Sequence, residues 1–336
     1  MEFDPETGKL DCGHCGYETT VEEMTKNPQQ EESFEEAEDA KEEGETGTFK
    51  VYRCPSCGAE MLTDEYTSAA ICGFCGTPGL MEDRLSGQLK PTFVLPFKIT
   101  REDAVDRFRV WTRGNILTPR GFSSSSTLEK ITGIYVPFWL YDYNTNVHLD
   151  AHCTRIRTSR SGDYEYTYTD HFDVSRDLNV EYDKIPADAS EKMNDKIMDL
   201  MEPFDFTQLK QFEMPYLSGF MSERYNFGSD ELQGRAKNRA RNFALQTARN
   251  TISGYSSVNV INQRRHIREL KENYVLLPVW MLNYRYKGTN YQFAINGQTG
   301  KQVGTLPVSG GRAASLFGAV SAAAFVLLTI IGGLIG

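Results

Sequence analysis

The sequence Val136-Pro-Phe-Trp-Leu-Tyr-Asp-Tyr143 returns 141 residues later as Leu277-Pro-Val-Trp-Met-Leu-Asn-Tyr284. Both copies have the order apolar-Pro-apolar-Trp-apolar-apolar-Asx-Tyr, and each follows a helical pattern and leads into β-rich sequence. The Pro in each copy predicts an edge strand or a strand start, because Pro cannot donate a ladder hydrogen bond. The Trp and the alternate apolar residues should be buried against their helix. We therefore expect an α+β fold with a duplicated helix-plus-antiparallel-sheet domain, its halves at 90–200 and 210–308 and packed as one unit.

Local signals place several elements around these copies. Thr100-Arg-Glu-Asp103 is a variant of the capping box and predicts the start of the first helix. Ser229-Asp-Glu predicts an N-cap followed by acids in the first turn, and the long helix should run from Asp230 to about Ser253. Tyr164-Glu-Tyr-Thr-Tyr168 alternates with period two and predicts a half-exposed strand. Asn296-Gly297 predicts the turn of a hairpin.

Cysteine spacing predicts a zinc ribbon at 49–85. Six of the seven cysteines lie in three Cys-x-x-Cys-Gly units, and fourteen residues separate the second unit from the third. Two knuckles at this distance are typical of a four-cysteine site for structural Zn²⁺. Disulfides or a redox pair are the alternative, and they are disfavoured because no secretory signal or thioredoxin-like pattern is present. The expected zinc ligands are Cys54, Cys57, Cys72 and Cys75.

The remaining unit, Cys12 and Cys15 in residues 1–21, has no partner pair before it. We interpret it as a partial zinc-ribbon knuckle, that is, half a site. Either the site is incomplete, or another group closes it, or the true start of translation lies upstream of Met1.

The net charge of −10 belongs mostly to one segment. Residues Glu22 to Thr46 contain eleven acids and two lysines, a local net of −9, so the rest of the chain is close to neutral. We interpret residues 22–48 as an acidic, solvated linker. Overall acidity therefore does not exclude an anionic partner elsewhere on the chain.

The C-terminal residues 313–336 predict a transmembrane helix. Ala313 to Gly336 contain no charged residue, and a helix of that length reaches roughly 36 Å, enough to cross a bilayer core. The alternative, a buried core helix, is disfavoured by the length and uniformity of the apolar run. Lys301 and Arg312 flank it on the N-terminal side, so we expect a tail anchor in the cell membrane with residues 1–312 in the cytosol.

Few patterns suggest catalysis. His148-Leu-Asp150-Ala-His152 places two imidazoles and a carboxylate on one strand face, a workable metal site, but an ordinary amphipathic strand with Cys153 turned inward explains the same pattern. His171 beside Asp170 lacks a recognisable nucleophile. Gly297-Gln-Thr-Gly300-Lys301 lacks the first Gly and last Ser/Thr of a phosphate loop and predicts a turn. We expect no enzymatic activity.

The long helix is strongly basic. It contains no acid from Leu232 to Ser253, and Arg264-Arg265-His266 with Arg268 follow shortly after it. Such cations contact anionic lipid, nucleic acid or an acidic partner, or they form a solvated helix face. The candidate residues for an anionic partner are Arg235, Lys237, Arg239, Arg241 and Arg249.

Several segments together resemble bacterial zinc-ribbon membrane proteins commonly labelled TFIIB-type zinc ribbon-containing proteins, sometimes primosomal or replication helicase-like. The segments are Cys54-Pro-Ser-Cys-Gly-Ala-Glu, Ala69-Ala-Ile-Cys-Gly-Phe-Cys-Gly-Thr-Pro, Leu89-Lys-Pro, Val94-Leu-Pro-Phe, both proline-tryptophan copies and Asn296-Gly-Gln-Thr-Gly-Lys. The resemblance implies no catalytic activity. It implies membrane anchoring of a phage-shock-protein-A-like or flotillin-like (SPFH) partner in envelope stress responses.

The family usually carries a further Cys-Pro-x-Cys-Gly knuckle just before its Met-x-Phe-Asp-Pro segment, and this chain starts at that Met. By the resemblance, Met1 would be an internal methionine and Cys12 and Cys15 half a site.

Together these observations predict a non-enzymatic, tail-anchored membrane protein whose zinc ribbon and α+β domain recruit or scaffold protein partners at the cytoplasmic face. The alternative is a nucleic-acid-binding zinc-ribbon protein that uses the Arg-rich helix. A metallohydrolase built on His148, Asp150 and His152 is disfavoured.

Overall fold

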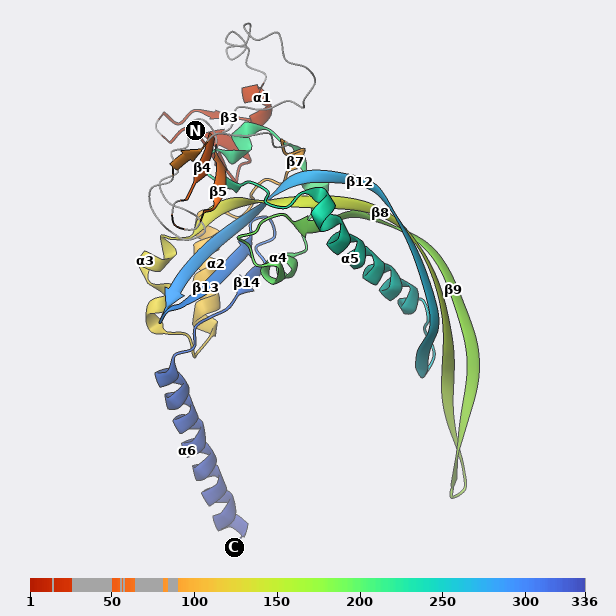
Figure 1. The fold of residues 1–336 in the computed structure, drawn as a ribbon. Coiled ribbons are helices and arrows are strands. Elements are labelled where there is room, and N and C mark those ends of the chain that lie inside the picture. The colour runs from red at the N-terminus through yellow and green to blue at the C-terminus, as the bar shows by residue number, and fades with distance from the viewer. Residues whose placement is uncertain are drawn as a thin grey trace. The chain divides into compact units, whose positions relative to one another are not determined.

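A computed structural model describes residues 1–13, 15–25, 50–54, 56, 58–63, 81–83 and 90–335 (Figure 1). The chain divides into two compact units. Unit 1 comprises Met1–Pro137, Lys192–Arg224 and Leu276–Gly336, and unit 2 comprises Phe138–Glu191 and Tyr225–Val275. The fold is mixed α+β, as expected.

Unit 1 contains most of the short elements. Its helices are α1 (Val21–Thr25), α2 (Arg101–Gly114), α3 (Ser125–Leu128), α4 (Asp195–Met201) and α6 (Gly310–Ile335). Its short strands are β1 (Glu2–Asp4), β2 (Lys9–Asp11), β3 (Glu18–Thr19), β4 (Lys50–Arg53), β5 (Glu60–Thr63), β6 (Met81–Asp83), β7 (Phe93–Val94), β10 (Lys210–Gln211), β11 (Met221–Glu223), β13 (Thr289–Asn296) and β14 (Gln302–Gly304).

Two long strands have residues in both units: β8 (Thr132–Ser161) and β12 (Ser257–Tyr286). They are neighbours in a sheet of order β10-β7-β12-β8-β11-β5-β4-β6, with β9 (Tyr164–Asp188) added to β8, β13 to β12 and β14 to β13. The strands β1, β2 and β3 form a separate sheet. The two proline-tryptophan copies lie within β8 and β12.

The tryptophans of the two copies make equivalent contacts. The indole N–H of Trp139 donates to the carbonyl of Phe227 at 3.0 Å, and that of Trp280 donates to the carbonyl of Ile99 at 2.8 Å. Each carbonyl lies two residues before a helix, α5 (Ser229–Asn250) and α2 respectively. Both tryptophans are 5% exposed, which confirms their burial, but the prediction that each is buried against its own helix is wrong. Each is held by the helix that lies in the other half of the sequence.

Each compact unit combines a helix from one half of the sequence with the proline-tryptophan copy from the other half. Unit 1 combines the first helix, α2, with the second copy, and unit 2 combines the second helix, α5, with the first copy. The units therefore cut across the predicted halves 90–200 and 210–308. Equivalent contacts are what a duplication predicts, and the duplication itself stays a prediction.

The expectation that the prolines mark an edge or a strand start is wrong, because Pro137 and Pro278 lie inside the neighbouring strands β8 and β12. Each proline sits where its strand changes partner. Strand β8 pairs with β11 through Ile134 and Tyr135 and with β9 from Phe138 onward. In strand β12 the carbonyl of Leu276 accepts a hydrogen bond from the N–H of Leu95, and pairing with β13 begins at Val279. A residue without an N–H fits between two partners.

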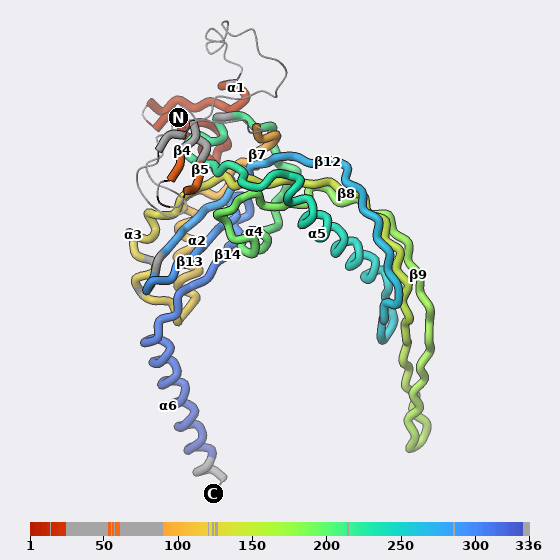
Figure 2. Tube along the Cα trace, viewed as in Figure 1, coloured from red at the N-terminus to blue at the C-terminus, as the bar shows by residue number. Residues whose placement is uncertain are grey.

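Unit 2 is a sheet covered on one face by a helix. Strands β8 and β9 pair antiparallel from Phe138↔Asp188 to Ser161↔Tyr164, and α5 lies along them (Figures 1 and 2). The residues Ala236, Ala240, Ala244 and Ala248 are fully buried, and Ala244 and Ala248 pack with Val147, Leu149, Ala151 and Cys153 of β8. Alanine at every fourth position gives the helix a flat stripe that approaches the sheet closely.

Of the predicted helix starts and turns, two are confirmed and one is wrong by one residue. The Thr100 hydroxyl accepts from the N–H of Asp103 at 3.1 Å, which confirms the first helix start. The second start is wrong by one residue: Gly228 is the N-cap, and Glu231 accepts from its N–H at 3.3 Å. The hairpin at Asn296-Gly297 is confirmed by the pair Ile295↔Gln302.

The segment 164–168 is a strand, as predicted, but it is not half-exposed. Tyr164, Tyr166 and Tyr168 are 72%, 49% and 53% exposed, and Glu165 and Thr167 between them are exposed as well. Alternation alone cannot distinguish one covered face from two open ones.

We expect Ala244→Leu to lower the free energy of unfolding by about 1–3 kcal/mol, because the added carbons overpack the α5 contact with the sheet. Gln246→Leu, on an exposed position of the same helix, should change it by less than about 0.5 kcal/mol. Denaturant unfolding of the full chain in detergent measures both. Equal effects of the two substitutions would contradict the packing described.

Candidate functional site

Helix α6 is long and apolar enough to cross a membrane. Its segment Gly310–Ile331 has a mean hydropathy of 2.3, and none of its most apolar window is buried in the protein. Phe317, Phe325 and Leu328 are 76%, 69% and 68% exposed. A core helix of a soluble protein passes the same length and composition test, but such a helix is mostly buried. The prediction for 313–336 is thus confirmed as a candidate membrane span.

The base of α6 is fixed to the loop after α2. The Arg312 guanidinium donates to the carbonyl of Ile116 at 3.1 Å and to that of Thr118, and the N–H of Ser309 donates to the carbonyl of Leu117 at 2.9 Å. Arg312 is the last charged residue before the apolar run 313–336. Its contacts hold the start of α6 on the loop after α2.

Two of the three Cys-x-x-Cys-Gly units show the same backbone turn. The N–H of Gly16 donates to Cys12 at 2.8 Å and that of Cys12 to Tyr17 at 3.0 Å; the N–H of Gly58 donates to Cys54 at 2.9 Å and that of Cys54 to Ala59 at 2.9 Å. Both glycines have φ of +70°, a conformation that favours Gly. The two turns are therefore built alike.

The metal ligands themselves are only partly placed. Cys57, Cys72 and Cys75 lie outside the described residues, whereas Cys54 is buried, Cys12 half-buried and Cys15 exposed. Within the ranges that the structure describes, no group of three or more His, Cys, Asp or Glu side chains is arranged to hold a metal ion. The structure thus gives the turn of the predicted ribbon and not its ligand set.

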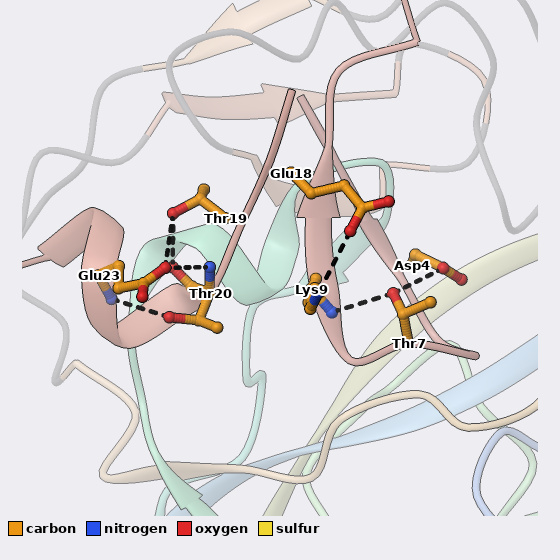
Figure 3. A network of polar contacts seen from close by, with 7 residues as sticks. All are labelled: Asp4, Thr7, Lys9, Glu18, Thr19, Thr20 and Glu23. Carbon is orange, nitrogen blue, oxygen red and sulfur yellow. Dashed lines mark hydrogen bonds and ion pairs between the residues drawn. The ribbon is translucent and has the colours of Figure 1, made fainter. Parts of the chain in front are cut away.

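The knuckle of Cys12 belongs to the small sheet β1-β2-β3, which polar contacts tie together (Figure 3). Lys9 pairs with Glu18 at 3.2 Å across β2 and β3, and the Glu23 carboxylate of α1 accepts from Thr19 at 3.3 Å and from the N–H of Thr20 at 3.2 Å. Phe3 and Leu10 form its buried side. Cys12 and Cys15 therefore lie on an ordered module.

The five cations of the long helix do not form one surface. Arg235 pairs with the Asp188 carboxylate at 2.9 Å, and that side chain is 1% exposed. Arg239 donates to the carbonyl of Pro186 at 2.6 Å. Arg241 donates to Asn238 at 3.3 Å, while Lys237 is half-buried and Arg249 exposed. Two of the five candidates thus hold the end of β9 within unit 2.

The opposite face of the unit 2 sheet carries a histidine–aspartate network. His148 Nδ1 meets Asp177 at 2.7 Å and His148 Nε2 meets Asp150 at 3.1 Å. Asp150 also accepts from Ser175 at 2.8 Å and from Asn262 at 3.1 Å. The contact of His148 with Asp150, with Leu149, Ala151 and Cys153 buried, confirms the predicted alternation.

His152 is not part of the His148 group. Its Nδ1 meets Asp173 at 3.0 Å and its Nε2 meets His171 Nδ1 at 3.1 Å. The predicted trio His148, Asp150 and His152 is therefore divided between two clusters. The His152–His171 pair depends on the register of β8 with β9, Thr154↔His171, and no local sequence signal announces it.

Hydrogen bonding shifts the pKa values of two groups on this face. The Asp177 carboxylate, followed by that of Asp150, raises the pKa of His148, and the Ser175 hydroxyl lowers the pKa of Asp150. Beside His148 lies an open cavity of about 480 Å³ whose lining includes Asn146, Asp177, Arg264, Arg265 and His266. The carboxylates are engaged by imidazole, hydroxyl and amide groups, which is the geometry of a polar sheet face.

Beyond α5 the hairpin of β8 and β9 continues as a two-stranded ribbon, whose outer part at residues 155–170 we term the ribbon end (Figures 1 and 2). Tyr164, Tyr166 and Tyr168 stand on one side of it, opposite Ser161, Ser159 and Arg157 of β8. We term this side the tyrosine face. Sequence reasoning placed the strand but not this exposed surface.

The chain is 41% identical over 337 aligned positions to the protein named uncharacterized protein YdjG of Bacillus subtilis (strain 168), with 100% of this chain and 95% of the relative covered. The chain therefore belongs to the YdjG family. No family model matches the sequence. No solved structure matches it either.

We expect His148 to titrate above the ordinary pKa of about 6.5, and Asp177→Asn to lower its pKa. The bond stabilises the protonated imidazole, so its contribution to stability is complete below the unfolded pKa and is lost as pH rises through the folded pKa. NMR titration of labelled histidines measures this. Asp173→Asn, which removes the partner of His152, is the control, and an equal response of His148 to both would contradict the network.

Proposed function

We propose that this member of the YdjG family is a non-enzymatic, single-pass membrane protein that recruits a protein partner to the cytoplasmic face of the cell membrane. The observation that carries the proposal is α6, an uncharged helix of membrane-spanning length beyond Arg312, with apolar side chains that the protein leaves exposed. Exposed apolar surface of this extent is stable in lipid and not in water.

The charges around α6 support the cytoplasmic side. Arg312 and Lys301 precede the apolar run, and positive residues near a span favour the cytoplasmic side. Arg312 is already held by the carbonyls of Ile116 and Thr118, so it marks a fixed boundary between the charged and apolar parts of the chain. Unit 1 would then lie next to the membrane on that side.

The ribbon end supports a role in protein–protein binding. It presents three exposed tyrosines on one side, and tyrosine is enriched where proteins bind one another. From the resemblance, the partner would be a phage-shock-protein-A-like or flotillin-like (SPFH) protein in an envelope stress response.

The two alternatives gain no support from the described residues. Nucleic-acid binding by α5 would use its five candidate cations, and two of them, Arg235 and Arg239, instead hold Asp188 and Pro186. A metallohydrolase would need His148, Asp150 and His152 around one ion, and they belong to two separate clusters. We therefore propose that unit 2 acts in binding and not in catalysis.

Membrane recruitment is tested by removing α6. A chain ending at Ser309 should move to the soluble fraction and take with it a protein that otherwise sediments with membranes. Replacing α6 by an unrelated apolar span should restore both to the membrane. The proposal fails if the shortened chain remains in salt-washed membranes, or if no protein follows the chain between fractions.

We also propose that the predicted zinc ribbon at residues 49–85 binds one structural Zn²⁺ through Cys54, Cys57, Cys72 and Cys75. The glycine turn at Cys54 supports this, because such turns direct backbone N–H groups toward thiolate sulfur. Metal analysis of the purified chain should give one zinc, and Cys54→Ser should remove it. Cys153→Ser, in the buried cluster under α5, is the matched control, and zinc loss in both variants or in neither would contradict the assignment.

A further inference from the structure

The tyrosine face continues a packed interface outward. Along β9 the tyrosines stand on the same side as Phe172 and Val174, because register with β8 is regular from Tyr143 to Ser161. Val174 belongs to the cluster buried by Ala248 and Ile252. Helix α5 ends at Asn250, and the last cover is Tyr255, whose ring lies 5.3 Å from that of Phe172.

Beyond that cover the ribbon loses its third strand as well. Ser256 accepts from the N–H of Ile156 at 2.9 Å and donates its own N–H to Thr154 at 2.7 Å, and β12 begins only at Ser257. From Arg157 outward, no described residue outside the hairpin pairs with β8 or covers the tyrosines. An isolated two-stranded hairpin is marginally stable, and a third strand or a packing surface stabilises it.

The two strands of the tyrosine face differ in size and charge. Strand β9 carries the large rings of Tyr164 and Tyr166 opposite the small Ser161 and Ser159 of β8. Strand β8 contributes Arg157 and β9 contributes Asp170, which lie 2.9 Å apart on this side. A two-fold axis along the strands would place β9 of one copy over β8 of another, so rings meet small residues and acid meets base. A surface with this pattern is complementary to itself.

We propose that a second copy of this chain covers the tyrosine face, with β9 of each ribbon end over β8 of the other. The inference deepens the proposed function, because it rests on membrane anchoring by α6. The dimer would cover the tyrosine face of both chains, so a recruited partner would bind the paired chains at another surface.

The size of the face predicts where this dimer forms. A buried aromatic side chain covers about 150–250 Å², and the tyrosines are half to three-quarters exposed, so six of them bury roughly 500–1,000 Å². Stable protein interfaces bury about 1,200–2,000 Å². The pair is therefore weak between freely diffusing molecules, and membrane confinement raises the effective concentration enough to favour it.

Energy transfer between labelled full-length chains in lipid vesicles tests the proposal. Donor- and acceptor-labelled wild-type chains should transfer energy above the level of an unrelated monomeric single-span protein at equal density. Tyr164→Ser/Tyr166→Ser/Tyr168→Ser should reduce transfer to that level. Ile156→Ser/Thr167→Ser, on the other side of the same ribbon, should leave it at the wild-type value.

A charge exchange separates contact between copies from ribbon stability. Arg157→Glu and Asp170→Arg each place like charges together, so each variant alone should lose transfer. Mixed in equal amounts, the two variants should regain it, because the glutamate introduced in one variant would meet the arginine introduced in the other. Rescue cannot arise within a single chain.

Wild-type transfer at the level of random proximity, or no rescue in the mixture, would overturn the dimer. If a partner still follows α6 to the membrane in that case, only the dimer fails and the proposed function stands. If the full chain does not insert into vesicles, the proposed membrane anchor is contradicted, and the dimer that rests on it is contradicted as well.

Discussion

Two indole hydrogen bonds, each within one compact unit, connect segments from opposite halves of the sequence. Trp139 reaches the carbonyl before α5, and Trp280 reaches the carbonyl before α2, so each motif is completed by the helix of the other half of the sequence. An aromatic residue four positions before each helix joins the contact: Tyr225 lies 5.7 Å from Trp139 and Phe97 lies 5.1 Å from Trp280. Neither half of the sequence could form its own tryptophan site alone.

The alternation along β8 then decides what unit 2 can do. Leu149, Ala151 and Cys153 turn to the alanine stripe of α5, so His148, Asp150 and His152 turn to the outer face. Polar residues there bond to one another and to the neighbouring strands. The same alternation continues past the end of α5, where the side that was buried becomes the tyrosine face. The paired strands β8 and β9 thus produce a core, a polar surface and an exposed aromatic surface.

Sequence reasoning succeeds where a structure depends on near neighbours. The Thr100 cap, the turn at Asn296-Gly297 and the apolar run of α6 are decided by a few adjacent residues. It fails where the structure depends on how one strand pairs with another. The partner changes at Pro137 and Pro278 depend on strands far apart in sequence. The pairing of His152 with His171 depends on the register of the long β8–β9 hairpin. The spacing of Cys54, Cys57, Cys72 and Cys75 predicts a zinc site, and the last three of these cysteines lie outside the described residues.

The central claim is that α6 spans the membrane and leaves the two units in the cytoplasm. Protease digestion of oriented vesicles, read by mass spectrometry of ribbon-end and α6 peptides, tests it most directly. The account predicts that ribbon-end peptides are released only from inside-out vesicles and that α6 is protected in both orientations until detergent is added. Release of ribbon-end peptides from right-side-out vesicles, or digestion of α6 without detergent, would contradict it.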